Sequence, residues 1–112
     1  MSPDDSVRLR HMIDAIETAM KFAEGRSRQD LDSDDMLLFA LVRAVEIVGE
    51  AAAKVSVEGR AETPDVPWSA IVGMRNRLVH AYFDINRDIL WSTVTLALPP
   101  LLAQLRSAIP PG

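Results

Sequence analysis

The segment from about Asp32 or Ser33 to Ser56 limits the possible folds more than any other part of this sequence. Its apolar residues recur at helical spacing in two neighbouring stripes, which leave one narrow polar face. The stripes comprise Leu38, Leu41, Val45, Val48, Ala52 and Val55, and Leu37, Ala40, Ala44, Ile47 and Ala51. A helix that is apolar over most of its circumference is buried on several sides. We therefore expect a long central helix, capped by Ser33, that reaches both an internal core and a subunit interface.

Three further helices are predicted around this central helix. They run from about Asp4 to Phe22, from Trp68 to about Tyr82, and from about Arg87 to Ser107 with Asn86 as the N-cap. Pro99-Pro100 lies inside the last helix and interrupts its backbone hydrogen bonding, so a kink or break is expected near Leu98. The sequence has no strand-like alternation. The predicted fold class is all-α, an antiparallel bundle of four main helices in a single domain over residues 1–112.

Composition limits the classes of protein to which the chain can belong. With 112 residues, 48% of them hydrophobic, the chain can form one small core. It lacks the run of ~20 unbroken apolar residues of a membrane span, and its N-terminus has no export signal, so we expect a cytoplasmic protein without membrane association. The absence of cysteine excludes disulfides and thiolate metal sites.

The charge of the chain is unevenly distributed. A formal net charge of −4 argues against a broad electrostatic surface for nucleic acid. Residues 66–83, however, contain two arginines and no acidic residue, so this segment carries +2 and the remainder carries −6. If the chain binds a polyanion, we expect it to do so at one focused place in this segment.

The candidate functional residues lie in the octad from Arg75 to Tyr82. On a helical wheel Arg75 falls in the middle of an apolar arc, and Asn76 and His80, one turn apart, lie at the edge of that arc. The arc comprises Trp68, Ile71, Val72, Leu78, Val79 and Tyr82. A buried guanidinium cannot lose its charge and needs an anionic partner. The pattern therefore predicts a buried Arg75 that binds an anion.

Structural roles for the same residues are the alternative. Arg75 could be paired with Glu46 or Glu50 of the central helix, which would also neutralise it in the absence of substrate. Asn76 and His80 could form an ordinary hydrogen-bonded pair. Arg77 points away from the apolar arc and is expected to be a solvated charge that could contact a phosphate.

Several longer motifs surround the octad, and together they identify a family. They are Val45–Ala52, Pro64–Trp68, Ile71–Asn76 and Leu78–Phe83. With them the chain resembles the HepT-like (DUF86) family of HEPN-domain toxin ribonucleases, whose pattern of arginine, four residues, histidine, any residue and tyrosine is met by Arg75, His80 and Tyr82.

This resemblance implies a function. It implies the toxin of a type VII HEPN/MNT toxin–antitoxin system, a cytoplasmic endoribonuclease that acts on RNA without a metal or other cofactor. It also implies a partner, a minimal nucleotidyltransferase (MntA-type) antitoxin that silences the toxin by adenylylating the motif tyrosine, here Tyr82.

The residues are chemically suited to this reaction. Metal-free RNA cleavage needs a base for the ribose 2′ proton, an acid for the leaving 5′ oxygen and a cation beside the phosphate. His80 can act as base or acid near neutral pH, and Arg75 can hold two phosphate oxygens. Asn76 could orient the imidazole or bind phosphate.

The spacing of Arg75 and His80 has a structural consequence. Five residues separate their directions by about 140° on a straight helix, so the two side chains would not converge on one phosphate. Either the helix loosens near Val79, or two copies of the chain build the site together. The second option agrees with the highly apolar central helix, and we therefore predict a homodimer with a composite cleft.

Two other functions are consistent with the sequence. The chain could be a non-catalytic binding partner or antitoxin of a minimal nucleotidyltransferase. It could also simply bind a nucleotide at Arg75 and Asn76, although no glycine-rich phosphate loop supports this.

Overall fold

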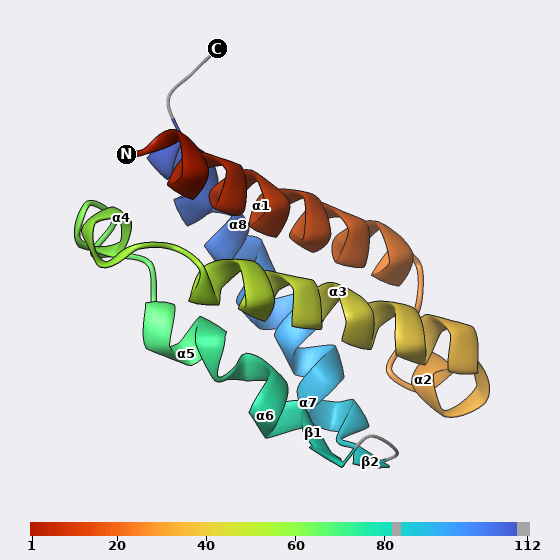
Figure 1. The fold of residues 1–112 in the computed structure, drawn as a ribbon. Coiled ribbons are helices and arrows are strands. Elements are labelled where there is room, and N and C mark those ends of the chain that lie inside the picture. The colour runs from red at the N-terminus through yellow and green to blue at the C-terminus, as the bar shows by residue number, and fades with distance from the viewer. Residues whose placement is uncertain (82–83, 110–112) are drawn as a thin grey trace.

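The structure is a computed structural model that describes residues 1–81 and 84–109, with the backbone but not the side chains at 79–81. Its long helices are α1 (Pro3–Ala23), α3 (Asp35–Ala53) and α8 (Leu98–Ala108), and the shorter ones are α2 (Asp30–Ser33), α4 (Val57–Ala61), α5 (Trp68–Val72), α6 (Met74–Leu78) and α7 (Arg87–Ser92). In Figure 1, α1 lies along one side of α3, and α5 and α6 lie along the other side. The predicted all-α fold is confirmed.

The chain also contains one small β-ribbon that the sequence did not predict. Strands β1 (Val79–Ala81) and β2 (Asp84–Ile85) pair antiparallel, with Val79 opposite Ile85. The backbone N–H of Asn86 donates to the carbonyl of Leu78 at 2.7 Å and closes the base of the ribbon. The two facing residues Val79 and Ile85 are β-branched, which favours extended backbone over helix. The expectation of no strands was therefore wrong at this one place.

The predicted first helix is confirmed as α1, and its sequence explains both its beginning and its packing. Ser2 accepts a hydrogen bond from the backbone N–H of Asp5, and Pro3 occupies the first turn, where no N–H is needed. The buried side chains recur at helical spacing: Leu9, Met12, Ile13, Ile16 and Ala19. They cover the faces of α3 and α8.

The central helix is shorter than predicted at both ends. Its N-cap is Asp34, whose carboxylate accepts from the backbone N–H of Leu37 at 3.1 Å, whereas the predicted cap, Ser33, ends the separate helix α2. Ser56 does not continue this helix, because its hydroxyl caps α4 by accepting from the N–H of Gly59. The buried residues of α3 nevertheless span both predicted stripes.

The predicted third helix, from Trp68 to Tyr82, is wrong in its continuity. It is interrupted at Gly73, where α5 ends, and α6 ends at Leu78, where the backbone becomes extended. Tyr82 itself lies outside the described residues. A helical wheel drawn through this whole segment therefore assigns faces that the chain does not have.

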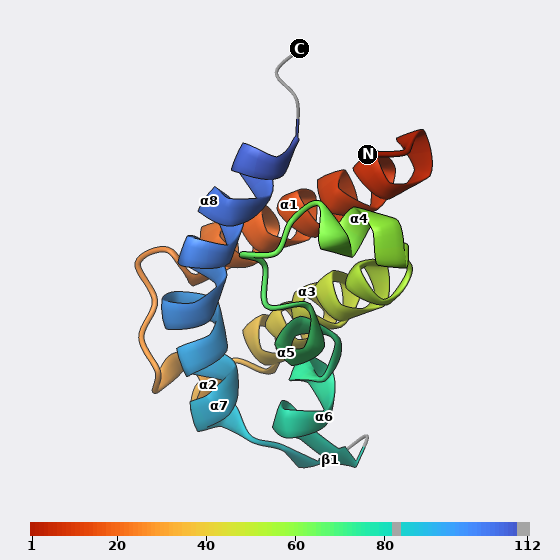
Figure 2. The same ribbon diagram turned by 90° about the vertical axis from the view of Figure 1, so that its left-hand side faces the viewer.

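The predicted fourth helix is confirmed, with an irregularity near the expected place. Asn86 caps α7 by accepting from the N–H of Ile89 at 3.0 Å. Residues Thr93–Ala97 form a π-helical turn, η1, in which the N–H of Leu98 donates to the carbonyl of Thr93. This wider turn accommodates the missing N–H groups of Pro99-Pro100, so the helix continues into α8 without a break. Figure 2 shows α7 and α8 as one column beside α5 and α6.

The stretch Arg87–Ala108 is long and apolar enough to cross a membrane when judged by length and composition alone. The core helix of a soluble protein passes the same test, so this is weak evidence for a membrane span. In this structure Leu90, Val94, Leu98 and Leu105 of the stretch are buried, and α8 packs on α1.

A buried carboxylate joins α1 to α4. Asp5, 4% exposed, accepts hydrogen bonds from both the hydroxyl and the backbone N–H of Ser56. Both bonds hold the pKa of Asp5 below its ordinary value of 3.8, and the bond from the Ser56 hydroxyl has the larger effect. Gly59 packs so closely that a Cβ there would lie 2.5 Å from a carboxylate oxygen of Asp5. The hydrogen bonds between Asp5 and Ser56 thus fix the beginning of α1 to the beginning of α4.

We predict that Asp5 makes the stability of the fold depend on pH below about 4. Because its pKa is lowered on folding, its contribution is complete above the unfolded value and is lost as the pH falls through the folded value. Asp5→Asn should therefore lower the urea midpoint near neutral pH. The difference between the midpoints of variant and wild type should shrink as the pH falls below about 4. A difference that stays constant down to pH 2.5 would contradict this role.

Candidate functional site

Arg75 is half exposed, not buried as the wheel predicted. Its side chain retains 47% of its accessible surface. The buried side chains of α6 are Met74 and Leu78, one turn apart, so the face of α6 that packs on the core is centred between them. Arg75 lies at the edge of this face, where its guanidinium reaches solvent. The prediction of a guanidinium inside an apolar arc was wrong, but the observed position leaves this cation accessible to a dissolved anion.

The counter-charge of Arg75 comes from α3. Arg75 Nε lies 3.9 Å from Glu46 Oε1, an ion pair too long to be a hydrogen bond. The side chain of Glu46 is 24% exposed and is therefore the more buried partner. Glu50, the other acid considered for this role, instead accepts a hydrogen bond from Arg43 at 3.3 Å. Of the two candidate acids, the structure places Glu46 beside Arg75.

Arg43 is a residue that sequence reasoning missed at this site. Its Nη1 lies 3.7 Å from Glu46 Oε2, so Glu46 directs one oxygen at each of two arginines. Arg43, Glu46 and Glu50 recur at spacings of three and four along α3, which places them on one stripe of that helix. The same spacing was visible in the sequence, but the contact with α6 required the fold.

The other described candidates on α6 have different surroundings. Asn76 is exposed. Arg77 is exposed too, and one of its terminal nitrogens donates to the carbonyl of Ala70 at 3.0 Å. This bond satisfies a carbonyl near the end of α5 and directs the Arg77 side chain back along the chain toward α5.

The remaining candidates lie at the edge of what the structure describes. The backbone of His80 belongs to β1, directly after α6, while its side chain lies outside the described residues, as does all of Tyr82. Asn76 and His80 therefore do not share one helix, and their predicted one-turn spacing was wrong. The helix does stop at Leu78, so the 140° separation of Arg75 and His80 does not apply.

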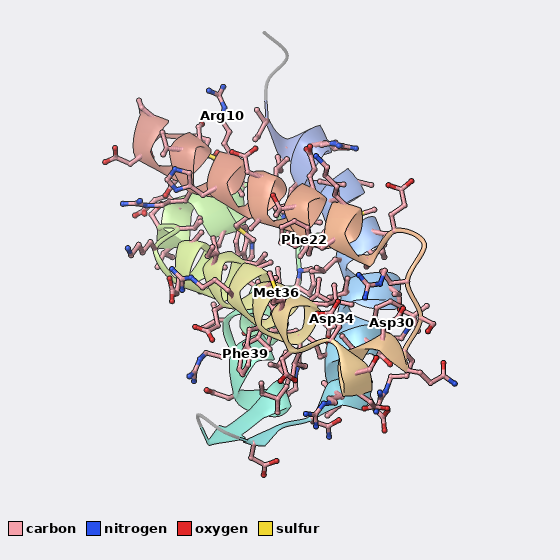
Figure 3. The ribbon with its side chains drawn as sticks, turned by 90° about the vertical axis from the view of Figure 1, so that its right-hand side faces the viewer. Arg10, Phe22, Asp30, Asp34, Met36 and Phe39 are labelled. Atoms are coloured by element: carbon pink, nitrogen blue, oxygen red, sulfur yellow. The ribbon has the colours of Figure 1, made fainter. Side chains whose placement is uncertain are left out.

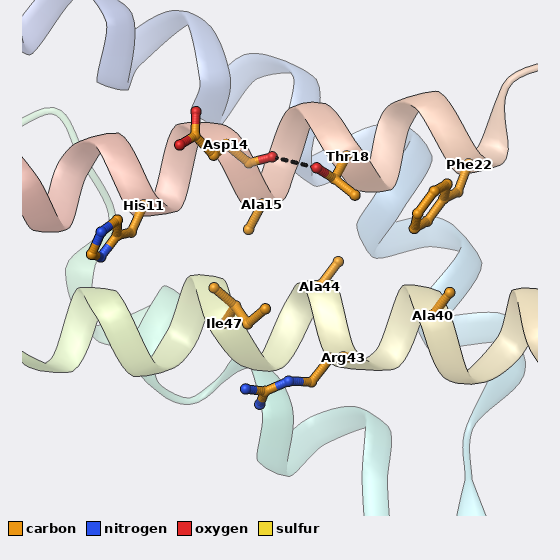
Figure 4. Close-up of a pocket in the computed structure, with 9 residues that line it drawn as sticks. All are labelled: His11, Asp14, Ala15, Thr18, Phe22, Ala40, Arg43, Ala44 and Ile47. Atoms are coloured by element: carbon orange, nitrogen blue, oxygen red, sulfur yellow. Dashed lines mark hydrogen bonds between the residues drawn. The ribbon is translucent and has the colours of Figure 1, made fainter.

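A groove runs between α1 and α3 (Figure 4). It has a volume of about 440 Å³ and is lined mainly by small or apolar side chains. From α1 it is lined by His11, Asp14, Ala15, Thr18 and Phe22, and from α3 by Ala40, Arg43, Ala44 and Ile47. Arg43 thus belongs both to the wall of the groove and to the ion pairs that lead to Arg75.

Large apolar side chains are exposed beside the groove. Met36 is 84% exposed and Phe39 58% exposed, and both precede Arg43 on the same stripe of α3. Figure 3 shows them at the beginning of α3, and Phe22 at the end of α1. The signal in the sequence was the presence of Met36 and Phe39 in the helical phase otherwise occupied by charges.

The described residues offer no obvious alternative centre of chemistry. Among the side chains that the structure describes, those of residues 1–78 and 84–109, no three acidic or histidine groups gather closely enough to hold a metal ion. An accessible guanidinium can bind the oxygens of a carboxylate or phosphate group through two parallel hydrogen bonds.

Comparison with known proteins gives a consistent result. The family model described as "Ribonuclease HepT-like" matches residues 12–108. A protein of Caldanaerobacter subterraneus subsp. tengcongensis, named as a candidate RNase, is 36% identical over 90% of this chain and 90% of its own length. A protein of Thermococcus cleftensis named "Probable ribonuclease HepT" is 34% identical over 83% of this chain and 84% of its own. No solved structure matches significantly.

We predict that Arg75 contributes little to the stability of the fold. Its side chain is half exposed and its ion pair is long, so Arg75→Ala should change the free energy of unfolding by less than about 1 kcal/mol. Urea denaturation of wild type and variant measures this directly. A loss of more than about 2 kcal/mol would assign Arg75 a structural role instead.

Proposed function

Because the chain belongs to the HepT-like ribonuclease family, we propose that it is a metal-independent endoribonuclease whose catalytic residues are Arg75, His80 and Asn76. The observation that carries this proposal is the accessible guanidinium of Arg75, whose ion pair with Glu46 is long. An incoming phosphodiester can replace such a weak contact with two hydrogen bonds. The backbone position of His80, just past the end of α6, supports the same assignment.

The reaction follows from the chemistry of these groups. The ribose 2′ oxygen attacks the neighbouring phosphorus while an imidazole takes its proton, and the P–O5′ bond breaks as an imidazolium protonates the leaving oxygen. The products are a 2′,3′-cyclic phosphate and a 5′ hydroxyl. Arg75 stabilises the charge that accumulates on the phosphate oxygens. Asn76, exposed on the same short helix, supplies a hydrogen bond to phosphate or imidazole.

The proposal includes regulation by a partner protein. We propose that the chain is the cytoplasmic toxin of a type VII toxin–antitoxin system and that a minimal nucleotidyltransferase silences it by transferring AMP from ATP to the hydroxyl of Tyr82, with release of pyrophosphate. An AMP group near His80 would add a negative phosphate at the place where RNA must bind, and would therefore block the substrate by charge and by volume. Arg77, which lies on α6 with Arg75, is a secondary contact for the RNA phosphates in this proposal.

We expect purified, unmodified protein to cleave RNA in the presence of EDTA. His80→Ala should lower the rate about 10²–10⁴-fold because the proton carrier is lost, and Arg75→Ala about 10²–10³-fold because the phosphate loses its cation. The measurement is the rate of fragment formation from a labelled RNA, with the fragment ends identified by mass.

Arg10→Ala provides a matched control, because it removes an exposed arginine of α1. Its rate should equal that of wild type. If Arg75→Ala and His80→Ala also cut as fast as wild type, the assigned site is wrong. A wild-type protein that does not cut any RNA, yet rescues cells from its neighbouring nucleotidyltransferase, would be a non-catalytic partner or antitoxin.

We further propose that the active form is a homodimer whose interface includes the groove between α1 and α3. Met36, Phe39 and Phe22 expose large apolar surfaces along this face, and burial of such surfaces drives association. The charges of the face, Arg43 against Glu46 and Glu50, are of mixed sign and can pair with those of a second copy across a two-fold axis. Since this face continues to Arg75, a second copy would bring two sites together.

A dimer on this face predicts opposite results for two similar substitutions. Phe39→Glu should convert a dimer of about twice the chain mass into a monomer, as measured by sedimentation, and cleavage should fall with it. Val57→Glu changes an apolar residue that is more exposed than Phe39, 80% against 58%, and that lies in α4 outside the lining of the groove, and it should leave mass and activity unchanged. Loss of the dimer in both variants, or in neither, would contradict the assigned face.

Mixing two inactive variants tests whether the cleft is composite. If each site combines Arg75 of one copy with His80 of the other, mixing Arg75→Ala with His80→Ala should restore about one quarter of wild-type activity, because half of the dimers hold one intact site. If both residues of a site come from one copy, mixing restores nothing.

A further inference from the structure

Four side chains of alternating charge form a row across α3 to α6. Glu50 accepts from Arg43 at 3.3 Å, Arg43 lies 3.7 Å from Glu46, and Glu46 lies 3.9 Å from Arg75. The order is therefore acid, base, acid, base, with Arg75 at one end. Each inner member is shared between two partners of opposite charge.

Glu46 is the member on which the row depends. It directs Oε2 at Arg43 and Oε1 at Arg75. Its side chain is less exposed than the other three, so its charge is the least screened by water and its position the best fixed. Since neither of its contacts reaches hydrogen-bond distance, a small rotation of its carboxylate strengthens one ion pair and weakens the other.

The geometry points to a positioning role for this row: we propose that Glu46 is shared competitively by Arg43 and Arg75, and that Arg43 thereby sets how readily Arg75 binds a phosphodiester. A stronger hold of Arg43 on Glu46 frees Arg75 for the anion. A weaker hold leaves Glu46 to Arg75, which then releases its carboxylate less readily. The inference rests on the proposed function only in taking Arg75 as the anion contact.

Single substitutions should then change anion affinity in a defined order. Arg43→Ala leaves Glu46 to Arg75 alone and should weaken binding about two- to fivefold, the range expected for an exposed ion pair. Glu50→Gln frees Arg43 to pair with Glu46 and should strengthen binding by a smaller factor. Glu46→Gln removes the competitor itself and should strengthen binding the most.

These directions alone would also follow from simple charge attraction, so the decisive test is a double-mutant cycle. If Arg43 acts through Glu46, the effect of Arg43→Ala should disappear in the Glu46→Gln background. If Arg43 attracts the anion directly through solvent, its effect should be the same in both backgrounds. If Glu46 has only a structural role, the effect of Arg43→Ala on anion affinity should be the same with and without Glu46→Gln.

The probe is a fluorescent 2′-O-methyl RNA oligonucleotide, which presents phosphodiesters but cannot be cleaved by attack of the 2′ oxygen. The dissociation constant is measured by anisotropy at low ionic strength for wild type, the single variants and the double variant. Arg106→Ala is the matched control, because Arg106 forms an exposed ion pair with Glu17 at 3.2 Å between α8 and α1. It should leave the affinity unchanged.

The outcomes separate this inference from the proposed function. An equal effect of Arg43→Ala with and without Glu46 overturns the inference, even if the protein cleaves RNA. Loss of that effect in the Glu46→Gln background supports it, even if no cleavage is found. Binding that is absent, or insensitive to Arg75→Ala, removes Arg75 as the anion contact and overturns both.

Discussion

The burial of α3 between α1 on one side and α5, α6 and α7 on the other is the interaction on which this structure depends. The residues of α3 that are almost inaccessible, among them Leu38, Leu41, Val45 and Val48, form the middle of the core. With most of its circumference covered, α3 has one stripe left for solvent, and that stripe carries Met36, Phe39, Arg43, Glu46 and Glu50. The groove, the row of charges and Arg75 lie on this stripe or beside it. The packing of the core thus determines which side chains are available for function.

The sequence predicted the elements whose signals are local. Asn86 caps a helix because its side chain reaches a backbone N–H three residues away, and α1 needs only its own apolar spacing and Pro3. Predictions failed where two local signals compete. Ser33 and Asp34 are both good N-caps, and the choice between them depends on α2, which the sequence did not reveal. Gly73 tolerates a helix or a break, and only the packing of α5 and α6 against α3 decides.

For the candidate site, the sequence indicated candidate residues but not their surroundings. The motif indicated Arg75, and Glu46 was one of two acids considered for it, because both lie on the polar face of α3. The wheel failed because it assumed one continuous helix and a broad buried arc, whereas the core-facing side of α6 is limited to Met74 and Leu78. A guanidinium one position beyond that side is solvated, and the energetic demand for a buried counter-ion disappears. Contacts between helices, such as the ion pair of Glu46 in α3 with Arg75 in α6, depend on how α6 packs on α3 and cannot be obtained from spacing within one helix.

Arg43 links the groove to the row of charges. It lines the groove between α1 and α3 and also pairs with Glu46, the acid that lies beside Arg75. A second chain seated in the groove must therefore meet the Arg43 guanidinium, and it either supplies an acid that draws Arg43 away from Glu46 or excludes water and tightens that pair. In the first case Glu46 turns to Arg75, and in the second Arg75 is released for substrate. If Arg43 and Arg75 share Glu46 as proposed, occupation of the groove and the affinity of Arg75 for an anion are thermodynamically linked through Arg43. Such linkage is reciprocal, so an anion on Arg75 would change the strength of association by the same factor.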